Sequence, residues 1–517
     1  MKCALMISLL LKENVEGMRV LDMGCGTGIL GILAVKKGAL MVTAIDVVSP
    51  YADIIGLSAS SEKNQSGITT QDKLDFVIKT LPDLVPRADE IAGKMSLLIK
   101  EAGEINPDDY PTVFAGYEVR EKIRSAYELA DTANNMIKNA KPLLEASPYL
   151  MGVDGERTYM VIFQNDKELR PTGGFITAYS IAKISKGKFD PTLSDDIYNL
   201  DEKYTPSVTA PGPIIKYIKG PYLLSNKLRL RDMNFSADFA DSMDLFSKEI
   251  KKAGINNIDG IIAVDTQLLV NLLQVLGPIE VPGYGKFSNE IVDECNCPQV
   301  IYELESFADI EGPVVWSQDE PGKIIFAPAN YDNRKKIIGP LMNSILSAAL
   351  GQSNEKIAAL FETGVKSMSE KHVLFYLNNE KAQKAVEEFG IGGVLKTFDG
   401  DYLHINDANL GGRKSNLYVT QEVSQEVDID SDGNVSKNLT ITYKNPEKHD
   451  GWLNSVLPNW VRVYVPQGSE LISAEGLEDK EKPYDEYGMT VFAGYFELRP
   501  QGVAKITLKY KLPFKVG

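Results

Sequence analysis

The alternation of hydrophobic and polar positions divides the chain into zones of different secondary structure. In residues 151–411, strand-like runs such as TYMVIFQ, ITAYSIAKI and IDGIIAVD alternate with helical runs such as SADFADSMDLFSKEIKKAG and TQLLVNLLQVLG. Residues 412–517 contain only strand-like runs, among them NVSKNLTITYKN, WVRVYVP and VAKITLKYKL. This order predicts an α/β core with some parallel strand pairing, followed by an all-β sandwich.

The first 150 residues hold two shorter zones. A strand (RVLDM), a glycine loop (GCGTG), a helical run (ILGILAVKKG) and a second strand (MVTAID) predict one Rossmann-like βαβ fragment. The zone after it has helical spacing and is cut by prolines into several helices. We therefore expect a multidomain α/β plus all-β protein with four parts: a βαβ fragment at 1–50, a helical zone at 51–150, an α/β core at 151–411 and an immunoglobulin-like β-sandwich at 412–517.

Composition and charge exclude several classes of function. The 55 Lys and Arg residues against 71 Asp and Glu residues give a net charge of −16, which argues against nucleic-acid partners and anionic membranes. The four cysteines form no CxxC pairs and the three histidines lie far apart, so we expect no metal site. The sequence also predicts no transmembrane segment and no signal peptide, because its apolar stretches are short and no cleavage site follows the first one.

The glycine loop near the N-terminus carries the most specific motif. VLDMGCGTG, with Asp46 at the end of the next strand, resembles motif I of the class I methyltransferases, and the surrounding string resembles ribosomal protein L11 methyltransferases. Gly24, Gly26 and Gly28 let the backbone approach a ligand at a helix N-terminus. The resemblance implies S-adenosylmethionine as the cofactor, with Asp22 near its amino acid moiety and Asp46 accepting its ribose hydroxyls.

The remainder of a methyltransferase domain is not recognisable in the sequence. A working domain of that class needs a complete sheet, an adenine pocket and a substrate loop, and residues 51–150 show no further alternation of strand and helix. A single βαβ unit cannot bury both faces of its sheet. We therefore expect a truncated, non-catalytic fragment whose S-adenosylmethionine site is vestigial.

The larger part of the chain, about residues 60–517, resembles domain-of-unknown-function family 4012 of bacteria. The resemblance rests on YMVIFQNDKELRPTGGFITAYSIAKISKGK, LRDMNFSADF, IDGIIAVDTQLLVNLLQVLGPIEVPGYG and GGRKSNLYV, in that order. Phe235, Ala237 and Ala240 replace the usual Trp and Pro residues at packing positions. The family normally begins with a membrane-spanning helix, so the resemblance implies an extracytoplasmic location in the cell envelope, whereas an authentic βαβ fragment at the N-terminus implies a cytoplasmic one.

Two polar clusters inside these motifs are the ligand-binding candidates. The first follows a strand at a glycine turn and the second precedes a helix: Asn165, Glu168, Arg170 and Thr172, then Arg231, Asp232, Asn234 and Asp238. An arginine beside exposed backbone N–H groups can clamp a phosphate. The structural alternatives are an arginine that braces the turn, an ion pair between Arg231 and Asp232, and a helix N-cap at Asp238. An anion site requires that both arginines converge on a concavity without being paired to buried carboxylates.

A weaker similarity connects one of these motifs with phosphate chemistry. The strand–helix unit at 258–281 is similar in layout to a unit of the LytR–CpsA–Psr phosphotransferases, which place Arg and Asp residues around a pyrophosphate. That similarity implies Arg170, Arg231 and Asp232 as pyrophosphate residues and an anionic envelope glycolipid or glycopolymer as the partner.

Three functions remain open at this point. The first is a bacterial cell-envelope protein that binds or transfers a phosphate-linked glycopolymer, the second a methyltransferase, and the third a non-enzymatic surface interaction or scaffold protein. No catalytic residue is identified, so the sequence leaves open whether the chain is an enzyme.

Smaller features have structural interpretations. We expect capping or turn roles for Asp259 and Asp265, and a loop pair, free or bridged, at Cys295 and Cys297. We also expect the C-terminal sandwich to fold alone, with Trp452 or Trp460 in or near its core.

Overall fold

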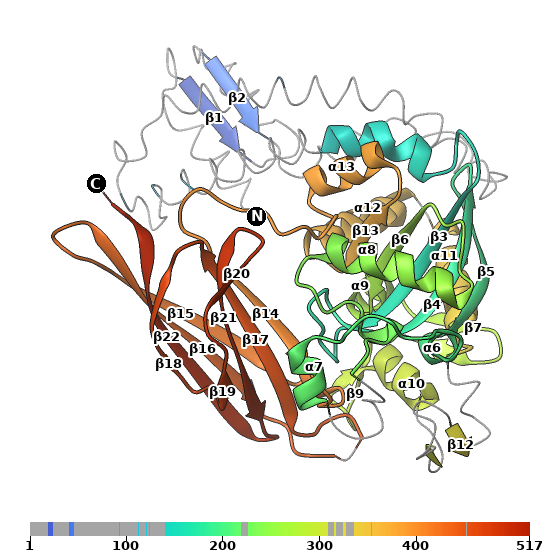
Figure 1. The fold of residues 1–517 in the computed structure, drawn as a ribbon. Helices are drawn as coiled ribbons and strands as arrows, with labels where there is room; N and C mark the ends of the chain where they lie inside the picture. Colours follow the sequence, from blue (N-terminus) through green and yellow to red (C-terminus); the bar gives the residue numbers. More distant parts are fainter. Residues whose placement is uncertain are drawn as a thin grey trace. The chain divides into compact units, whose positions relative to one another are not determined.

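The computed structural model of the chain divides into two compact units, residues 1–144 with 353–358 and residues 145–352 with 359–517. It describes residues 19–23, 41–45, 93, 112, 120, 124, 140–218, 226–308, 315–316, 324–326, 335–352, 354–450 and 452–516. The second unit contains most of the described elements and mixes helices with several sheets, as the sequence predicts (Figure 1).

A five-stranded sheet forms the centre of the α/β core. Its order is β13-β6-β3-β4-β5, and its strands are β3 (Arg157–Asn165), β4 (Phe175–Ser185), β5 (Lys188–Asp196), β6 (Gly260–Asp265) and β13 (Val373–Leu377). β3 and β6 are parallel, whereas the other neighbours are antiparallel. The predicted parallel pairing is therefore confirmed for this one pair of strands.

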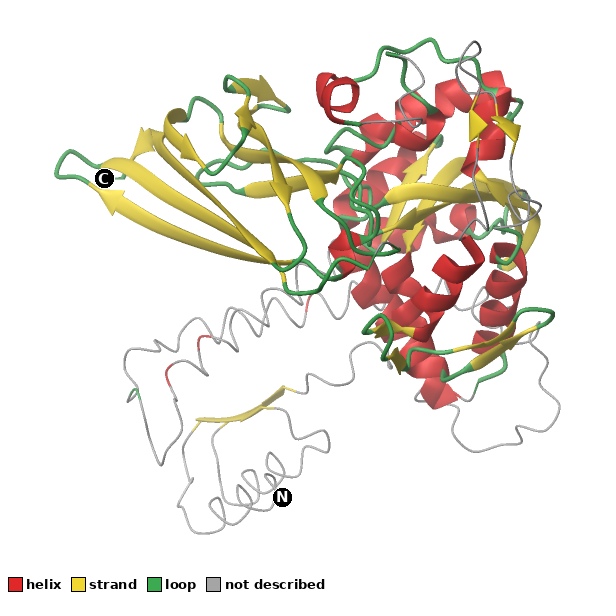
Figure 2. Ribbon diagram, turned by 90° about the horizontal axis from the view of Figure 1, so that it is seen from below, coloured by secondary structure: helices red, strands yellow, loops and turns green. Residues whose placement is uncertain are grey.

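Helices and short strands surround this sheet (Figure 2). The described α-helices of the second unit include α6 (Ile197–Lys203), α7 (Gly212–Tyr217), α8 (Phe239–Glu249), α9 (Thr266–Leu276), α10 (Gln299–Ala308), α11 (Ile338–Leu350), α12 (Asn354–Ser369, whose first residues belong to the other unit) and α13 (Glu380–Phe389). The 3-10 helices are η3 (Leu230–Asp232), η4 (Ile250–Ala253) and η6 (Ser415–Leu417). The short strands are β7 (Ile279–Val281), β8 (Gly285–Phe287), β9 (Ile291–Val292), β10 (Cys297–Pro298), β11 (Val315–Trp316) and β12 (Ile324–Phe326).

The C-terminal part consists of two sheets. One has the order β14-β17-β21-β19 with β20 also paired to β21, and the other has the order β15-β16-β22-β18. Their strands are β14 (His404–Asn409), β15 (Thr420–Ile429), β16 (Asn434–Asn445), β17 (Leu457–Pro466), β18 (Glu470–Glu475), β19 (Asp479–Lys480), β20 (Tyr484–Glu486), β21 (Met489–Leu498) and β22 (Gly502–Lys515). The all-β composition is thus observed, while the immunoglobulin-like type stays a prediction.

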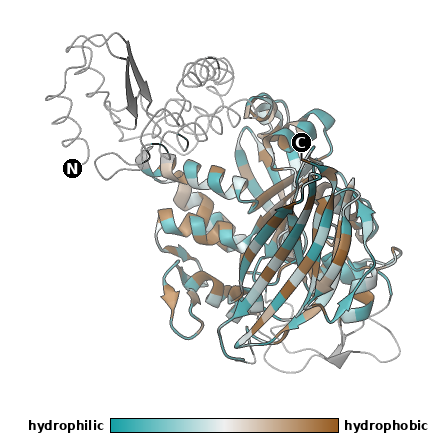
Figure 3. Cartoon of the chain, turned by 90° about the vertical axis from the view of Figure 1, so that its left-hand side faces the viewer, coloured by the Kyte–Doolittle hydropathy of each residue, from teal (hydrophilic) through white to brown (hydrophobic). Residues whose placement is uncertain are grey.

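The sheet that contains β17 and β21 is buried on both of its faces. Val461 and Val463 point into the core between the two C-terminal sheets. Trp460 and Tyr464, at the alternate positions of the same strand, belong instead to the core that includes the α/β sheet. The four-stranded sheet differs, because its strands alternate between hydrophobic and hydrophilic positions (Figure 3).

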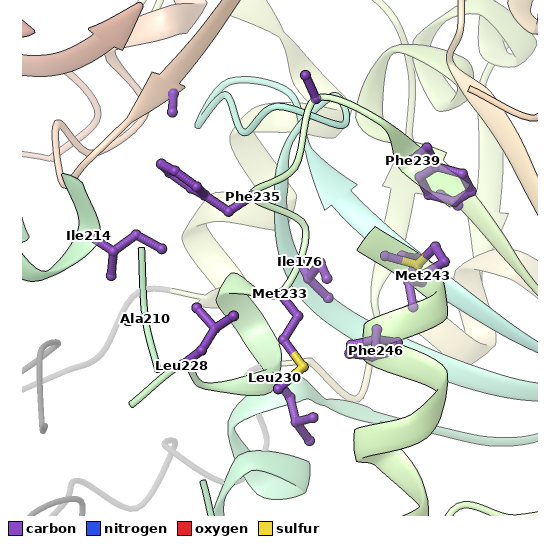
Figure 4. Close-up of a cluster of buried hydrophobic side chains, with 14 of the residues drawn as sticks. Ile176, Ala210, Ile214, Leu228, Leu230, Met233, Phe235, Phe239, Met243 and Phe246 are labelled. Carbon is purple, nitrogen blue, oxygen red and sulfur yellow. The ribbon is translucent and has the colours of Figure 1, made fainter. Parts of the chain in front are cut away.

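The core of the α/β part extends without a break onto the C-terminal sheet that contains β14, β17 and β21. Around Phe239, Met243 and Phe246 of α8, buried side chains from β4 and from the segment before α8 pack together (Figure 4). The same cluster continues to Trp460 and Val491. One hydrophobic core therefore unites strands that lie more than 300 residues apart in sequence.

The two tryptophans differ from expectation in their surroundings. Trp460 is buried, but on the face of β17 that lies opposite the core between the two C-terminal sheets. Trp452 packs against a third cluster, which includes α9, α11 and the disulfide between Cys295 and Cys297. Neither tryptophan belongs to the core between the sheets, because the α/β part supplies apolar neighbours that the sequence pattern of residues 412–517 does not reveal.

The N-terminal prediction falls mostly outside the described residues. The two described strands, β1 (Arg19–Met23) and β2 (Met41–Ile45), pair in parallel, with Asp22 opposite Ala44. The predicted glycine loop, Asp46 and the helices of zone 51–150 lie outside the described residues, apart from single positions, and the Rossmann-like assignment stays a prediction. Over the part of the chain that the structure describes, no helix has the length and apolarity needed to cross a membrane.

Candidate functional site

The eight candidate residues come together from two loops beside the central sheet. The turn between β3 and β4 supplies Asn165, Glu168, Arg170 and Thr172, and η3 with the segment before α8 supplies Arg231, Asp232, Asn234 and Asp238. All of them except Glu168 are buried. Buried polar groups must find partners inside the protein, so their partners reveal their role.

A chain of alternating charges connects the two arginines. Oδ1 of Asp232 lies 3.4 Å from Nη2 of Arg170, and Oδ2 of Asp232 lies 3.7 Å from Nε of Arg231. Arg231 also donates from Nη1 to Oδ2 of Asp201 at 2.9 Å. The four side chains are at most 10% exposed. The arginines do converge, but on a shared carboxylate.

Aromatic rings and burial complete the surroundings of this charge chain. The Arg170 guanidinium lies 5.0 Å from the ring centre of Phe175, and that of Arg231 lies 4.6 Å from the ring centre of Tyr198. Burial alone would lower the pKa of Arg231, but Tyr198 and Asp201 raise it above its ordinary value. Burial raises the pKa of Asp201 to about 6, against the opposing effect of Arg231. The loss of hydration therefore offsets much of the attraction between these charges.

A second group of charges surrounds the start of the same turn. Asn165 donates from Nδ2 to Oε1 of Glu305 at 2.8 Å. Nζ of Lys414 lies 3.5 Å from Oε2 of Glu168 and 3.6 Å from Oε2 of Glu305. Burial would lower the pKa of Lys414, but these two carboxylates raise it above its ordinary value. The lysine therefore stays charged and joins the turn to α10.

Thr172 and Asn234, the next two candidates, form hydrogen bonds with uncharged groups. Thr172 Oγ1 accepts from Nε2 of Gln164 at 3.1 Å and from Nδ2 of Asn234 at 3.0 Å. Asn234 Nδ2 also donates to the carbonyl of Gly174 at 2.8 Å. Asn234 Oδ1 is a buried atom with no hydrogen-bond partner among the described residues. The amide therefore fixes the glycine turn through its nitrogen alone.

Asp238 has the structural role that the sequence allowed for it. Its Oδ1 accepts from the backbone N–H of Asp241 at 3.0 Å, which caps the N-terminus of α8. Its Oδ2 accepts from the backbone N–H of Leu395 at 2.9 Å. Burial raises the pKa of Asp238, while the backbone N–H groups oppose that shift. Both carboxylate oxygens are thus used within the fold.

The sequence reasoning missed the partners on the C-terminal sheets. Arg170 donates to the carbonyl of Asn409, and Asn406 Nδ2 donates to the carbonyl of Pro171 at 2.9 Å. Arg462 Nη2 donates to the carbonyl of Phe235 at 2.9 Å. Arg462 interrupts the apolar run WVRVYV, which is the one sequence signal that could have pointed to it. We call these contacts of the two loops with β14 and β17, together with the charge chain of Arg170, Asp232, Arg231 and Asp201, the polar joint.

The polar joint does not meet the condition for an anion site. Each of the two arginines faces a buried carboxylate, and Arg170 also donates to a backbone carbonyl. A guanidinium whose donors are directed at protein acceptors has few left for a phosphate. The geometry favours the structural interpretation of Arg170, Arg231 and Asp232, and their binding of a ligand stays a prediction.

Another polar cluster lies at the carboxyl ends of β3 and β6. Nδ1 of His372 lies 2.7 Å from Oδ2 of Asp265, whose Oδ1 caps α9. Thr266 donates to Asp166, and Asp166 pairs with Lys167 at 2.6 Å. The hydrogen bond to Asp265 raises the pKa of His372. The cap at Asp265 was expected from the sequence, but His372 was not, because more than 100 residues separate the two.

Metal-binding arrangements are absent from the part of the chain that the structure describes. No group of three or more His, Cys, Asp or Glu side chains there has an arrangement that could hold a metal ion. Of the predicted S-adenosylmethionine residues, Asp22 lies in β1, and Gly24, Gly26, Gly28 and Asp46 lie outside the described residues.

Two family models match separate segments of the chain. Residues 154–302 match a family described as a protein of unknown function, DUF4012. Residues 3–74 match the family of ribosomal protein L11 methyltransferase, PrmA. Both resemblances inferred from the sequence motifs are therefore confirmed over these segments, while the wider extent of about 60–517 expected for the first stays a prediction.

The curated relatives found for this chain match short N-terminal stretches. The chain is 66% identical over 44 residues to the ribosomal protein L11 methyltransferase of Porphyromonas gingivalis, and 61% identical over 41 residues to that of Phocaeicola vulgatus. Each match covers 8% of this chain and 15% of the relative. The chain thus spans about one seventh of the length of these relatives. No solved structure matches the chain.

Proposed function

We propose that the chain is a non-enzymatic interaction or scaffold protein of the bacterial cell envelope. The observation that carries this proposal is the polar joint, in which the residues best suited to hold a phosphate are buried and paired with each other. Asp232 pairs with both arginines, and Arg170 in turn donates to the carbonyl of Asn409 on β14, which stabilises the contact between the α/β core and that C-terminal sheet. Among the described residues, the surface of the two C-terminal sheets and of the helices around the α/β sheet is then the part that would contact other molecules.

The envelope location has support from the cysteines and from the family resemblance. Cys295 and Cys297 form a disulfide inside a buried cluster. Structural disulfides persist in oxidising compartments and are rare in the cytosol. Together with the match of residues 154–302 to the DUF4012 family, this favours a location outside the cytoplasm.

The experiment compares two anionic or cofactor probes on the full chain. We expect that neither inorganic pyrophosphate nor S-adenosylmethionine at millimolar concentration raises the midpoint of thermal unfolding. Saturable pyrophosphate binding that Arg170→Lys abolishes would identify a phosphate site and overturn the proposal. The lysine keeps the charge but loses the planar fork, so it tests recognition of phosphate more directly than removal of the side chain.

Methylation is the second candidate, because the match of residues 3–74 is specific. Its support ends with the segment itself, which represents about one seventh of a complete enzyme. Micromolar binding of S-adenosylmethionine that Asp46→Ala removes would place methylation ahead of the scaffold function.

A further inference from the structure

β15 differs from the other long strands of the C-terminal part in its exposure. It is the outermost strand of its sheet among the strands that the structure describes. Nine of its ten residues are exposed and only Gln425 is partly covered, whereas β17 and β21 are almost wholly buried. A strand in this position has neighbours on one side only and presents the other side of its backbone outward.

One side of β15 carries an apolar row that the core leaves uncovered. Val423 lies opposite Ile441 and Ile429 lies opposite Val435, and both partners on β16 are buried between the two sheets. Residues directly opposite each other point to the same face of a sheet. Nevertheless, the exposed fractions of Val423, Val427 and Ile429 are 46%, 51% and 56%. These side chains therefore lie on the face of the sheet that packs against the core, but the opposite sheet does not cover them.

The other side of β15 carries an acidic row. Glu422, Glu426 and Asp428 alternate with the apolar residues. Nζ of Lys444 on β16 lies 2.8 Å from Oε1 of Glu422, diagonally across the strand pair, since Lys444 is directly opposite Thr420. This contact shows how a lysine on an adjoining strand meets an acidic side chain of β15.

The edge of β15 lacks several of the usual protections against pairing with another strand. Exposed edges are commonly protected by charged side chains, above all lysine, by proline, by a bulge or by being short. The charged side chains of β15 are all acidic, so they oppose pairing with an acidic or identical strand but not with a basic one. β15 contains neither lysine nor proline, and its pairing with β16 runs through ten residues without a shift of register. β18, at the other edge of the same sheet, is shorter and has a register shift between Leu471 and Ser473. The two edges are thus unequal, and β15 is the one suited to further pairing.

We propose that β15 is a docking edge for an extended segment of a partner protein in which apolar and basic residues alternate. The partner would add a strand to the sheet, placing its apolar side chains beside Val423 and Val427 and its lysines or arginines beside Glu426 and Asp428. This inference rests on the proposed interaction function and names the surface that performs it.

Charge complementarity favours such a partner over a second copy of the chain. An antiparallel copy of β15 that aligns Val423 with Val427 also places Glu422 opposite Asp428. A parallel copy in register places each acidic residue opposite itself. Like charges directly opposite each other destabilise strand pairs.

The test uses the full chain and two synthetic ten-residue peptides, one alternating valine with lysine and one alternating valine with glutamate. We expect the lysine peptide to bind saturably, as measured by fluorescence anisotropy, and to slow amide hydrogen exchange in residues 420–429. The glutamate peptide should bind at least tenfold more weakly.

Variants then locate the site. Val427→Lys places a charge in the apolar row and should weaken binding of the lysine peptide at least tenfold. The double change Glu426→Lys with Asp428→Lys reverses the charge of the acidic row on the other face and should weaken binding to the same extent. Ile472→Lys on β18 is the matched control, because Ile472 is likewise an apolar residue on an edge strand and is 58% exposed. This change should leave the affinity for the lysine peptide within twofold of the unchanged protein. The midpoints of thermal unfolding show that each variant is folded.

Several outcomes would overturn the docking edge. These are no saturable binding of the lysine peptide, equal binding of both peptides, or equal loss of binding in Val427→Lys and Ile472→Lys. A dimer in sedimentation that Val427→Lys dissociates would identify a second copy as the occupant instead. None of these results resembles pyrophosphate or S-adenosylmethionine binding, so failure of the docking edge is distinguishable from failure of the proposed function.

Discussion

Asp232 balances the charge of the polar joint. Its two oxygens face Arg170 and Arg231, and its side chain is only 10% exposed. Removing one partner from a buried ion pair leaves the other charge without compensation, and this costs more than the pair contributes when intact.

Asp232→Asn should therefore lower the free energy of unfolding by about 3 kcal/mol, as measured by urea denaturation. The amide keeps the shape of the side chain but removes its charge. Asp244→Asn is the control, because Asp244 is paired with Lys248 on an exposed helix surface, and it should cost less than about 1 kcal/mol. Equal effects of the two changes would mean that the joint contributes no more than a surface ion pair.

His372 gives the chain a pH-dependent contact. The hydrogen bond that the His372 imidazole donates to Asp265 raises the pKa of His372 above that of an exposed histidine, whereas burial, which lowers the pKa, and the neighbouring charges have smaller effects. A raised pKa in the folded state means that the contact stabilises fully below the unfolded-state value of about 6.5. The stabilisation is lost as the pH rises through the folded-state value.

His372→Gln should accordingly lower the free energy of unfolding by about 1.5 kcal/mol at pH 6. The loss should be smaller at pH 9. Urea denaturation of both proteins at the two pH values measures the difference, and an NMR titration of the imidazole gives its pKa directly. A loss of stability that does not change with pH would show that the contact does not depend on the charge of His372.

Residue roles were predictable where the partner is near in sequence. The N-cap of Asp238 follows from an acidic residue directly before an apolar-periodic helix. Arg170 stood out for its glycine turn, but its acceptor Asn409 lies 239 residues further along the chain. No local pattern relates two such positions, so the sequence identified the polar residues without showing that they pair with each other.

At the scale of elements, periodicity predicts strands well and their faces less well. β16 alternates buried and less buried residues, as a strand with one covered face should. β17 is buried at nearly every position, because the second C-terminal sheet covers one face and the α/β core covers the other. A continuous apolar run predicts such a strand but not which elements cover it.

The turn between β3 and β4 depends on a close backbone contact at Gly174. A Cβ atom there would lie 2.4 Å from the carbonyl carbon and oxygen of Asn165. Gly174→Ala should thus lower the free energy of unfolding by about 2 kcal/mol or more.

Gly212→Ala is the matched comparison for this substitution. A Cβ atom at Gly212, the first residue of α7, would meet nothing within 4 Å, and the change should be neutral or stabilising by about 0.5 kcal/mol. Thermal and urea unfolding of both variants measure the difference. A neutral Gly174→Ala would show that the turn can relax away from Asn165.

At the scale of the whole molecule, the shared core changes what we expect of the C-terminal part. Trp460, Tyr464 and Val491 lie in the core that includes the α/β sheet. A fragment of residues 400–517 would expose this apolar face. Arg462 in the same fragment would lose one of its acceptors, the carbonyl of Phe235, and keep the side chain of Asn406.

We now expect the 400–517 fragment to be unstable alone, with red-shifted tryptophan fluorescence and aggregation. The larger fragment 145–517 should unfold in one cooperative transition, because its core is continuous. Far-UV circular dichroism and tryptophan emission of both fragments are the measurements. A folded, monomeric 400–517 fragment with buried tryptophan would show that the C-terminal strands fold without the α/β core, as the strand pattern of residues 412–517 predicts.

The long reach of this core has a consequence for biosynthesis. Ile176 and Val491 belong to the same cluster, with about 315 residues between them. At about 5–20 residues per second, a ribosome takes about 15–60 s to pass from one to the other. During that interval the nascent α/β core has an uncovered apolar face, which is a substrate for chaperones and a site of premature aggregation. Because synthesis proceeds from the N-terminus, this exposure ends only when β17 and β21 have been made and pack onto the α/β core.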